Sequence, residues 1–133
     1  MIFGIGTDIV RIPRMAESLD RYGERFAARI LMAAEMAGFR EAAQPAPFLA
    51  KRFAAKEAAA KALGTGFRDG LRLRDIGVHS DALGKPGLVF SDRAEQLLRN
   101  RGVGAAHLSL ADESEYAIAY VVFERAASGD GHR

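Results

Sequence analysis

The sequence predicts a single α+β domain, with helices packed on a mostly antiparallel sheet. Three observations lead to this prediction. The chain has 133 residues, a length that suits one domain. Its first half, up to about residue 63, carries helical patterns, whereas the part after Gly70 has short segments rich in valine and isoleucine. The sequence also shows no internal repeats, linkers or low-complexity blocks, which would indicate another organisation.

The first half is expected to contain one strand followed by helices. Residues 2–10 are rich in isoleucine and interrupted by glycines, as is typical of a short buried strand. Helices are predicted at residues 13–22, 33–43 and 48–63. The first begins at Pro13, and a turn-rich piece at residues 26–31 precedes the second. The second ends where Pro45 and Pro47 interrupt the pattern.

The second half is expected to supply most of the sheet. Short strands are predicted at residues 76–79, 87–90, 106–110 and 116–123. A helix between the second and third of these strands is capped by Ser91 and ends near Gly102. We expect residues 1–126 to form the domain and residues 127–133 to form a flexible tail.

The composition excludes several classes of protein. With 19 basic and 17 acidic residues, the net charge of +2 gives no field of the kind that defines nucleic-acid binders. The absence of cysteine rules out disulfides, thiolate metal sites and cysteine nucleophiles. No apolar run approaches the roughly 18 residues that span a bilayer, and the N-terminus lacks the features of a signal peptide. We therefore expect a cytoplasmic protein that binds neither nucleic acid nor membrane.

The candidate metal ligands are carboxylates, because the chain has no cysteine and only three histidines. This composition favours a hard cation such as magnesium. Asp8 stands out because its strand is otherwise largely apolar, and an ionised carboxylate there is costly unless it is paired or bound to a metal. Two interpretations stay open here: Asp8 caps the next helix or pairs with an arginine, or it holds a metal ion.

Glu57 and Lys61 lie four residues apart in an alanine-rich helix, so they share one face of it. The simpler interpretation is an ion pair that supports the helix by roughly 0.2–0.5 kcal/mol. The functional interpretation is that Asp8 and Glu57, from separate elements, suit Mg²⁺, with the ammonium of Lys61 beside a phosphate group. The surrounding alanines leave little bulk, so a strand or a ligand can pack closely.

Two glycine pairs resemble nucleotide-binding loops without matching them. Gly4 and Gly6 lack the third glycine of a dinucleotide-binding fingerprint. Gly64 and Gly66 follow a helix and lack the lysine of a phosphate loop, so the simplest interpretation of Gly64 is a helix C-cap. Both pairs let a backbone or a ligand come close.

Four segments together resemble a known family. They are Gly4-Ile5-Gly6-Thr7-Asp8-Ile9, the run from Arg52 to Gly66 that includes Glu57 and Lys61, Gly84-Lys85-Pro86, and His107-Leu108-Ser109-Leu110. In this order and at this chain length they are similar to the bacterial holo-acyl-carrier-protein synthases, the short class of 4′-phosphopantetheinyl transferases. The resemblance covers nearly the whole chain and implies the fold of that family.

The resemblance implies transfer of the 4′-phosphopantetheine group of coenzyme A to a serine of an apo acyl carrier protein, in support of fatty acid biosynthesis. The products are the holo carrier protein and adenosine 3′,5′-bisphosphate. By the same resemblance, Asp8 and Glu57 hold Mg²⁺, and Lys61 contacts the phosphates. The implied coenzyme A site comprises Arg52, Lys61, Gly64, Lys85, Pro86 and His107. Short members of the family are homotrimers with coenzyme A between subunits, so a homotrimer is expected.

The resemblance also implies that the acidic carrier protein docks on the helix predicted at residues 13–22. Arg14 matches the docking position of the family best, Arg21 is a second candidate, and Met15 would be the apolar neighbour in the contact. The alternative for these residues is a solvated amphipathic helix face. For His107 the alternative is a hydrogen-bonded histidine that supports its strand.

One departure from the family pattern bears on the mechanism. Many members carry a second histidine where this chain has Ala111. The serine proton then needs another acceptor, and a magnesium-bound water is favoured over Asp112 or the metal-site carboxylates. Two other hypotheses stay open: a trimeric nucleotide-binding module without catalysis, and a structural domain in which Glu57 and Lys61 only support their helix.

Overall fold

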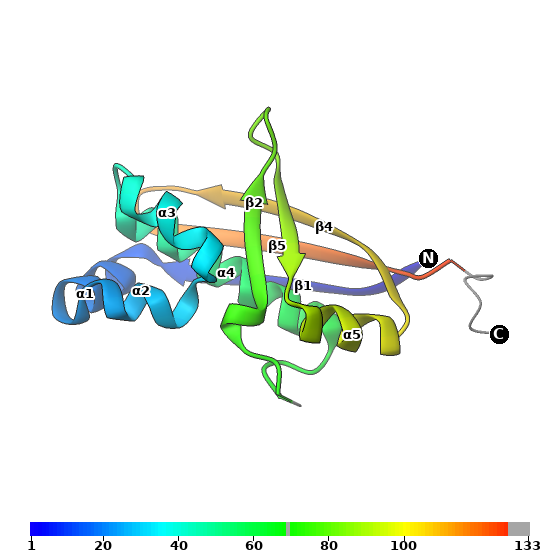
Figure 1. Cartoon of the computed structure of the whole chain (residues 1–133). Helices are drawn as coiled ribbons and strands as arrows, with labels where there is room; N and C mark the ends of the chain where they lie inside the picture. Colours follow the sequence, from blue (N-terminus) through cyan, green and yellow to red (C-terminus); the bar gives the residue numbers. More distant parts are fainter. Residues whose placement is uncertain (69, 128–133) are drawn as a thin grey trace.

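The computed structural model describes residues 1–68 and 70–127, which form an α+β domain (Figure 1). Its elements, in chain order, are β1 (Ile2–Arg11), α1 (Ile12–Tyr22), α2 (Glu24–Ile30), α3 (Ala33–Glu41), α4 (Pro45–Leu63), the 3₁₀ turn η1 (Leu73–Asp75), β2 (Ile76–Ser80), β3 (Pro86–Phe90), α5 (Asp92–Asn100), β4 (Val103–Asp112) and β5 (Tyr116–Arg125). The predicted fold class is confirmed. Most of the predicted tail, residues 128–133, lies outside the described residues.

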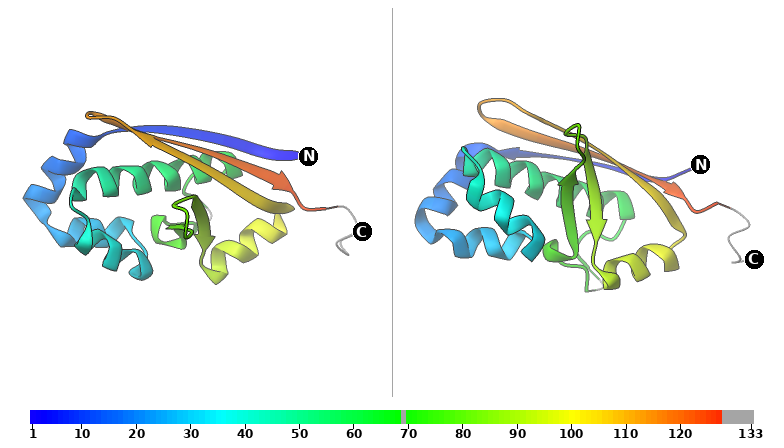
Figure 2. Two further views of the ribbon diagram at one scale, coloured as in Figure 1. Left: turned by 90° about the horizontal axis from the view of Figure 1, so that it is seen from above. Right: turned by 45° about the horizontal axis from the view of Figure 1, so that its top comes forward.

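The sheet consists of three antiparallel strands in the order β1, β5, β4, and β2 pairs with β3 in a separate hairpin. The helices of the described chain lie on one side of the sheet, and α4 runs along that face against β1 and β5 (Figure 2). Side chains alternate accordingly: Val10 and Val121 are buried toward α4, whereas Ile9 and Ile118, which face each other across β1 and β5, are exposed. In residues 1–68 and 70–127, no helix has both the length and the apolar character needed to cross a bilayer.

Small residues bring β1 and α4 unusually close. A Cβ atom added at Gly6 would overlap the carbonyl oxygen of Ala58 and come within 2.7 Å of the Ala62 nitrogen. One added at Gly4 would overlap the carbonyl oxygen of Ala62. The glycines of the first motif therefore serve backbone-to-helix contact, and the alanines of α4 form the other side of it.

Two predictions about the helical half need correction. The segment expected to be turn-rich, residues 26–31, belongs largely to α2, which begins at Glu24 and buries Ala27 and Ile30 one turn apart. The helix expected at residues 48–63 begins already at Pro45, because a proline in the first turn of a helix gives up an N–H that has no partner there.

Candidate active site

Asp8 on β1 and Glu57 on α4 line the same cleft, which has a volume of about 510 Å³. Asp8 lies in the alternating set of β1 residues that faces α4, two residues after Gly6. Glu57 precedes Ala58, whose carbonyl oxygen packs against Gly6. The close contact between strand and helix thus brings the two predicted metal ligands together from separate elements.

The surroundings of Glu57 disfavour its charge. Burial raises the pKa of Glu57 above its usual range, and the nearby Asp8 carboxylate raises it further, while Lys61 acts in the opposite direction. A divalent cation would remove this repulsion. Within residues 1–68 and 70–127, no group of three or more His, Cys, Asp or Glu side chains could hold a metal. Two protein oxygens, with water and substrate completing the shell, fit magnesium.

Lys61 lies one turn after Glu57 and reaches across to β1. Its Nζ atom is 3.0 Å from Asp8 Oδ1 and donates a 3.0 Å hydrogen bond to the Thr7 carbonyl oxygen. The ion pair predicted from the sequence was with Glu57, but the structure records Lys61 paired with Asp8. The lysine side chain is 53% exposed, so its ammonium borders both the carboxylates and the solvent, where a phosphate could meet it.

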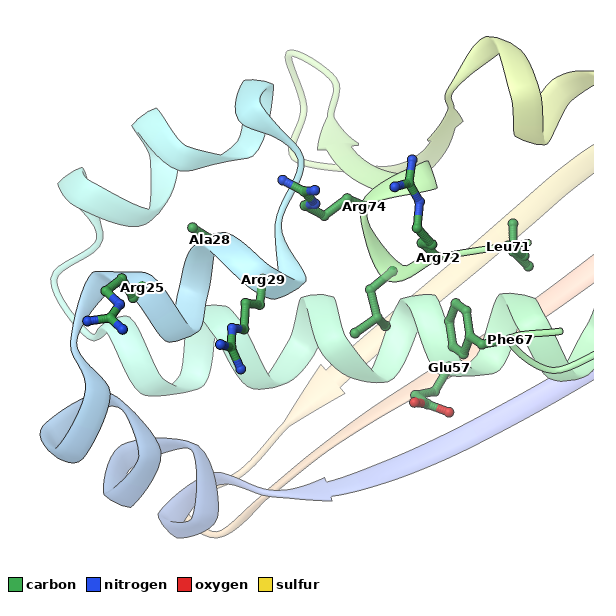
Figure 3. Close-up of a pocket in the computed structure, with 9 residues that line it drawn as sticks. Arg25, Ala28, Arg29, Glu57, Phe67, Leu71, Arg72 and Arg74 are labelled. Carbon is green, nitrogen blue, oxygen red and sulfur yellow. The ribbon is translucent and has the colours of Figure 1, made fainter. Parts of the chain in front are cut away.

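A larger cleft of about 730 Å³ adjoins Glu57, and arginines line its walls (Figure 3). Arg25 and Arg29 come from α2, and Arg72 and Arg74 come from the turn around η1. Arg72 and Arg74 were not predicted from the sequence. In the sequence they appear only as an alternation of leucine and arginine at residues 71–74, which is too short to indicate a site. The fold brings these arginines to the cleft that Glu57 lines.

The predicted docking residues fall in two neighbouring hollows. Arg14 and Met15 line the cleft that contains Asp8 and Glu57. Met15 is buried, so it supports α1 more than it offers an apolar contact. Arg21 lies in an adjacent hollow of about 440 Å³. The cleft thus joins one docking candidate, Arg14, directly to the predicted metal ligands.

The predicted coenzyme A residues do not converge within one chain. Lys61 and Gly64 lie at the end of α4, where Gly64 has φ of 92° and caps the helix as its simpler interpretation held. Lys85 and Pro86 lie in the β2–β3 hairpin, whose tip projects from the body of the molecule (Figure 1). His107 lies on β4, and its Nε2 is 2.6 Å from Glu124 Oε2. The last of the set, Arg52, belongs to a partly buried network on α4.

That network joins α3, α4 and β2, and two of its members, Lys56 and Glu35, were not predicted from the sequence. Lys56 is fully buried, and its Nζ donates to Glu35 Oε1 at 2.7 Å. Glu35 Oε2 accepts a hydrogen bond from the Val78 nitrogen and lies 3.1 Å from Arg52 Nε. Burial lowers the pKa of Lys56, which the Glu35 carboxylate opposes. One signal could have found Lys56: it continues the helix stripe of Leu49, Ala60 and Leu63, all of which are buried.

Asp112, one of the predicted proton acceptors, lies apart from the carboxylate site within the chain. The cross-strand register places Asp8, Ala119 and Leu110 side by side on β1, β5 and β4. Asp112 on β4 is therefore about 10 Å or more from Asp8, two strand spacings away. Its carboxylate pairs instead with Lys51, with Oδ1 3.5 Å from Nζ.

Known proteins are similar to this chain in sequence and fold. The family model described as 4′-phosphopantetheinyl transferase superfamily matches residues 4–121. A holo-[acyl-carrier-protein] synthase of Halorhodospira halophila is 56% identical over 122 residues, which cover 92% of this chain and 97% of that protein. One of Nitrosococcus oceani is 60% identical over 121 residues, covering 91% of this chain and 79% of that protein.

Solved structures agree. Holo-[acyl-carrier-protein] synthase from Neisseria meningitidis superposes with a TM-score of 0.90 at 45% identity, covering 94% of this chain and all of that one. The synthase from Bacillus anthracis, in complex with CoA (3′,5′-ADP), has a TM-score of 0.79 at 37% identity, with 95% and 99% of the two chains covered. With similarity over nearly its whole length, the chain belongs to the holo-[acyl-carrier-protein] synthases of the 4′-phosphopantetheinyl transferase superfamily.

Proposed function

We propose that the protein transfers the 4′-phosphopantetheine group of coenzyme A to a serine hydroxyl of an apo acyl carrier protein. The reaction is Mg²⁺-dependent, takes place in the cytoplasm and supports fatty acid biosynthesis. The observation that carries this proposal is the meeting of Asp8 and Glu57 in one cleft, with Lys61 beside them, in a chain of this family. Relatives crystallised with coenzyme A, among them the Helicobacter pylori synthase, support the choice of donor.

In the proposed reaction the serine oxygen attacks the phosphorus that carries the pantetheine arm. The bond from that phosphorus to the bridging oxygen breaks, and adenosine 3′,5′-bisphosphate leaves. Bound Mg²⁺ would neutralise the pyrophosphate, and Asp8 and Glu57 would hold it. Lys61 donates from its exposed ammonium to the phosphate oxygens and offsets the charge of the leaving group. The serine proton would pass to a water molecule held beside Asp8 and Glu57, the acceptor favoured from the sequence, because Asp112 is paired with Lys51.

The unbalanced positive charge around Arg52 favours the binding of a phosphate there. In its network two cations, Lys56 and Arg52, meet one carboxylate, Glu35, so one positive charge is left over. The Arg52 side chain is 16% exposed, and its guanidinium lies 3.9 Å from the centre of the Phe48 ring. A phosphate of coenzyme A would supply the missing negative charge in a geometry that suits guanidinium.

A homotrimer would bring the scattered coenzyme A residues together. Exposed apolar side chains gather on the sheet face opposite α4: Ile5, Ile9, Tyr116, Ile118 and Tyr120. His107 shares this face, because it lies opposite Val122 on β5, which in turn lies opposite Ile5 on β1. An exposed apolar surface of this kind marks an association site. Burying it against neighbouring chains would carry His107 of one subunit, and the Lys85–Pro86 hairpin, toward the α4 site of another.

We assign the arginine-lined clefts to the carrier protein, with Arg14 and Arg21 as docking residues and Met15 supporting their helix. Arg14 borders the cleft of Asp8 and Glu57, so a partner bound there would present its serine next to the predicted metal site. Basic side chains on a rim accelerate encounter with an acidic partner.

The test is the intact mass of a purified apo acyl carrier protein after incubation with the protein, coenzyme A and Mg²⁺. An increase by one phosphopantetheine, absent with EDTA and absent with a Ser→Ala carrier, is the expected result. No increase, although coenzyme A binds and the trimer forms, would favour a nucleotide-binding module without catalysis. No increase and no coenzyme A binding would favour a structural domain.

A further inference from the structure

Lys56 uses every hydrogen of its ammonium on a fixed partner. An ammonium group has three donors. One is bonded to Glu35 Oε1 at 2.7 Å, one to the Leu73 carbonyl oxygen at 3.3 Å, and one to the Ile76 carbonyl oxygen. Two of the three partners belong to the turn around η1, so this one side chain fixes the distance between α4 and the turn.

Glu35 holds the ammonium in place in turn. Its Oε1 atom also accepts a 2.8 Å hydrogen bond from the Met32 nitrogen, and its Oε2 atom accepts one from the Val78 nitrogen at 3.0 Å. The carboxylate is thus tied to the start of α3 and to β2, and its side chain is 3% exposed. Neither partner can move without breaking several buried bonds.

The turn that Lys56 holds is a wall of the site. Leu73 lines both clefts that contain Glu57, and Arg72 and Arg74 line the larger one. Lys56 and Glu57 are adjacent in α4. The same helical turn therefore presents Glu57 to the cleft and fixes the wall of that cleft on its other side.

We infer that Lys56, held by Glu35, is a positioning residue that sets the width of the cleft between Glu57 and the turn at residues 72–76. The inference rests on the proposed transfer reaction and deepens it. The cleft that Leu73 shares with Glu57 also contains Arg14, the best docking candidate, whereas Lys85 and His107 lie on other elements. Lys56 therefore acts more strongly on the binding of the carrier protein than on that of coenzyme A, which it reaches through Glu35 and Arg52.

Stability alone does not account for this arrangement. Replacing a buried ion pair by apolar side chains of similar volume is often neutral or even stabilising. What an apolar side chain cannot do is bond the carbonyl oxygens of Leu73 and Ile76, so the buried ammonium contributes position.

The test compares Lys56→Met with the double variant Glu35→Gln/Lys56→Met and with Val103→Ala, a core substitution at the start of β4 that lowers stability away from the turn. Lys56→Met should raise the KM for apo carrier protein by about tenfold or more, because it displaces a wall of the cleft in which the carrier docks. Displacements of about 1 Å at a reacting site lower enzymatic rates by up to about 100-fold, which sets the scale of the effect. The Kd of this variant for coenzyme A should rise less than the carrier KM, because Arg52 is still present and keeps its Glu35 partner. The double variant also removes the Glu35 carboxylate that lies 3.1 Å from Arg52 Nε, so it should be no more thermostable than the single variant, yet keep the raised KM.

An unchanged carrier KM in Lys56→Met, or an equal rise in Val103→Ala, would overturn the inference. So would a Kd for coenzyme A that rises as much as the carrier KM. Hydrogen exchange supplies a readout that needs no activity: the amides of residues 73–77 should exchange faster in Lys56→Met than in the wild type, and equal rates would also overturn the inference. A wild-type protein that transfers nothing would refute the proposed function, while the exchange rates would still decide whether Lys56 holds the turn.

Discussion

Glu57 carries a charge that the fold disfavours, because burial and the Asp8 carboxylate both raise its pKa. A residue kept in this state contributes to function at the expense of stability. We expect Glu57→Gln to lower transfer by about 100-fold or more, since even outer partners of metal ligands are worth about 10- to 100-fold. Without Mg²⁺ its Tm should not fall, because the amide removes the repulsion.

Asp8→Asn is the informative contrast. Asp8→Asn should lower transfer as much as Glu57→Gln does. It also removes the partner of Lys61, so its Tm should not exceed that of the wild type. Transfer is followed by intact mass, and Tm is measured in EDTA. Near-normal transfer by either variant across a Mg²⁺ titration would show that the metal ligands are other residues.

Arg14 is exposed and borders the cleft of the two carboxylates, so we expect it to contact the carrier protein. Arg14→Ala should raise the KM for the carrier protein more than it lowers kcat, and the difference from wild type should shrink at high salt. Arg99→Ala, on the exposed side of α5, is the matched control and should change neither constant. If the carrier KM of Arg14→Ala equals that of the control, docking occurs elsewhere.

Among the elements, the contact between β1 and α4 decides whether the carboxylates meet. Gly6→Ala would press a methyl group against the backbone of Ala58 and Ala62, which cannot move aside as a side chain can. We expect a loss of about 3 kcal/mol or more in the free energy of unfolding, at or above the usual cost of overpacking. Activity should fall in the fraction that stays folded, because Asp8 moves away from Glu57.

The control is Gly38→Ala in α3, whose added methyl would meet only the tip of the Phe48 ring at 3.3 Å. A helical Gly→Ala change is otherwise favourable by roughly 0.5–1 kcal/mol. Urea unfolding measures both variants. A Gly6→Ala protein as stable and active as Gly38→Ala would mean that strand and helix can separate without consequence for the site.

The turn around η1 is anchored to α5 by Asp75, and this anchor should show in the pH dependence of stability. Burial alone would raise the pKa of Asp75, but hydrogen bonds from Ser91 and the Arg72 nitrogen, together with the Arg93 charge, outweigh it and lower the pKa. The stability that the ionised carboxyl contributes is therefore present above its unfolded pKa of about 3.9 and is lost as the pH falls through the lower folded value.

Asp75→Asn should accordingly cost about 1–3 kcal/mol near neutral pH, as expected for a buried group that loses charged hydrogen bonds. The gap to wild type should narrow below about pH 4, where the Asp75 carboxyl of the unfolded chain begins to be protonated. Urea unfolding at neutral and acidic pH measures the gap. A constant gap across this range would mean that the charge of Asp75 has no part in the anchor.

At the scale of the whole molecule, sequence reasoning singled out residues whose signals are local. Asp8 and Glu57 each lie in a short motif, and the fold brings them into one cleft. It failed for α2, a helix of seven residues whose pattern is too short to read. It also missed the bond from Val78 to Glu35, since a contact between residues 43 positions apart leaves no periodic trace. The coenzyme A residues, spread over α4, the hairpin and β4, are a set that one chain does not complete.

The sheet face opposite α4 is left open by the helices of the described chain. Ile118 and Ile9 face each other across β5 and β1 and are 40% and 59% exposed, on the side that the helices leave open. A buried carboxylate without a partner is costly, so Ile118→Glu should break the proposed trimer into single 14.4 kDa chains that remain folded. Light scattering on a sizing column gives the mass, and circular dichroism gives the fold.

Coenzyme A binding should be lost with the trimer, because Lys85 and His107 then no longer reach the α4 site of a neighbour. Gln96→Glu, which adds the same charge on exposed α5, should leave mass and binding unchanged. If Ile118→Glu were monomeric and still bound coenzyme A normally, each chain would hold a complete site, and the proposed sharing of residues between subunits would be wrong.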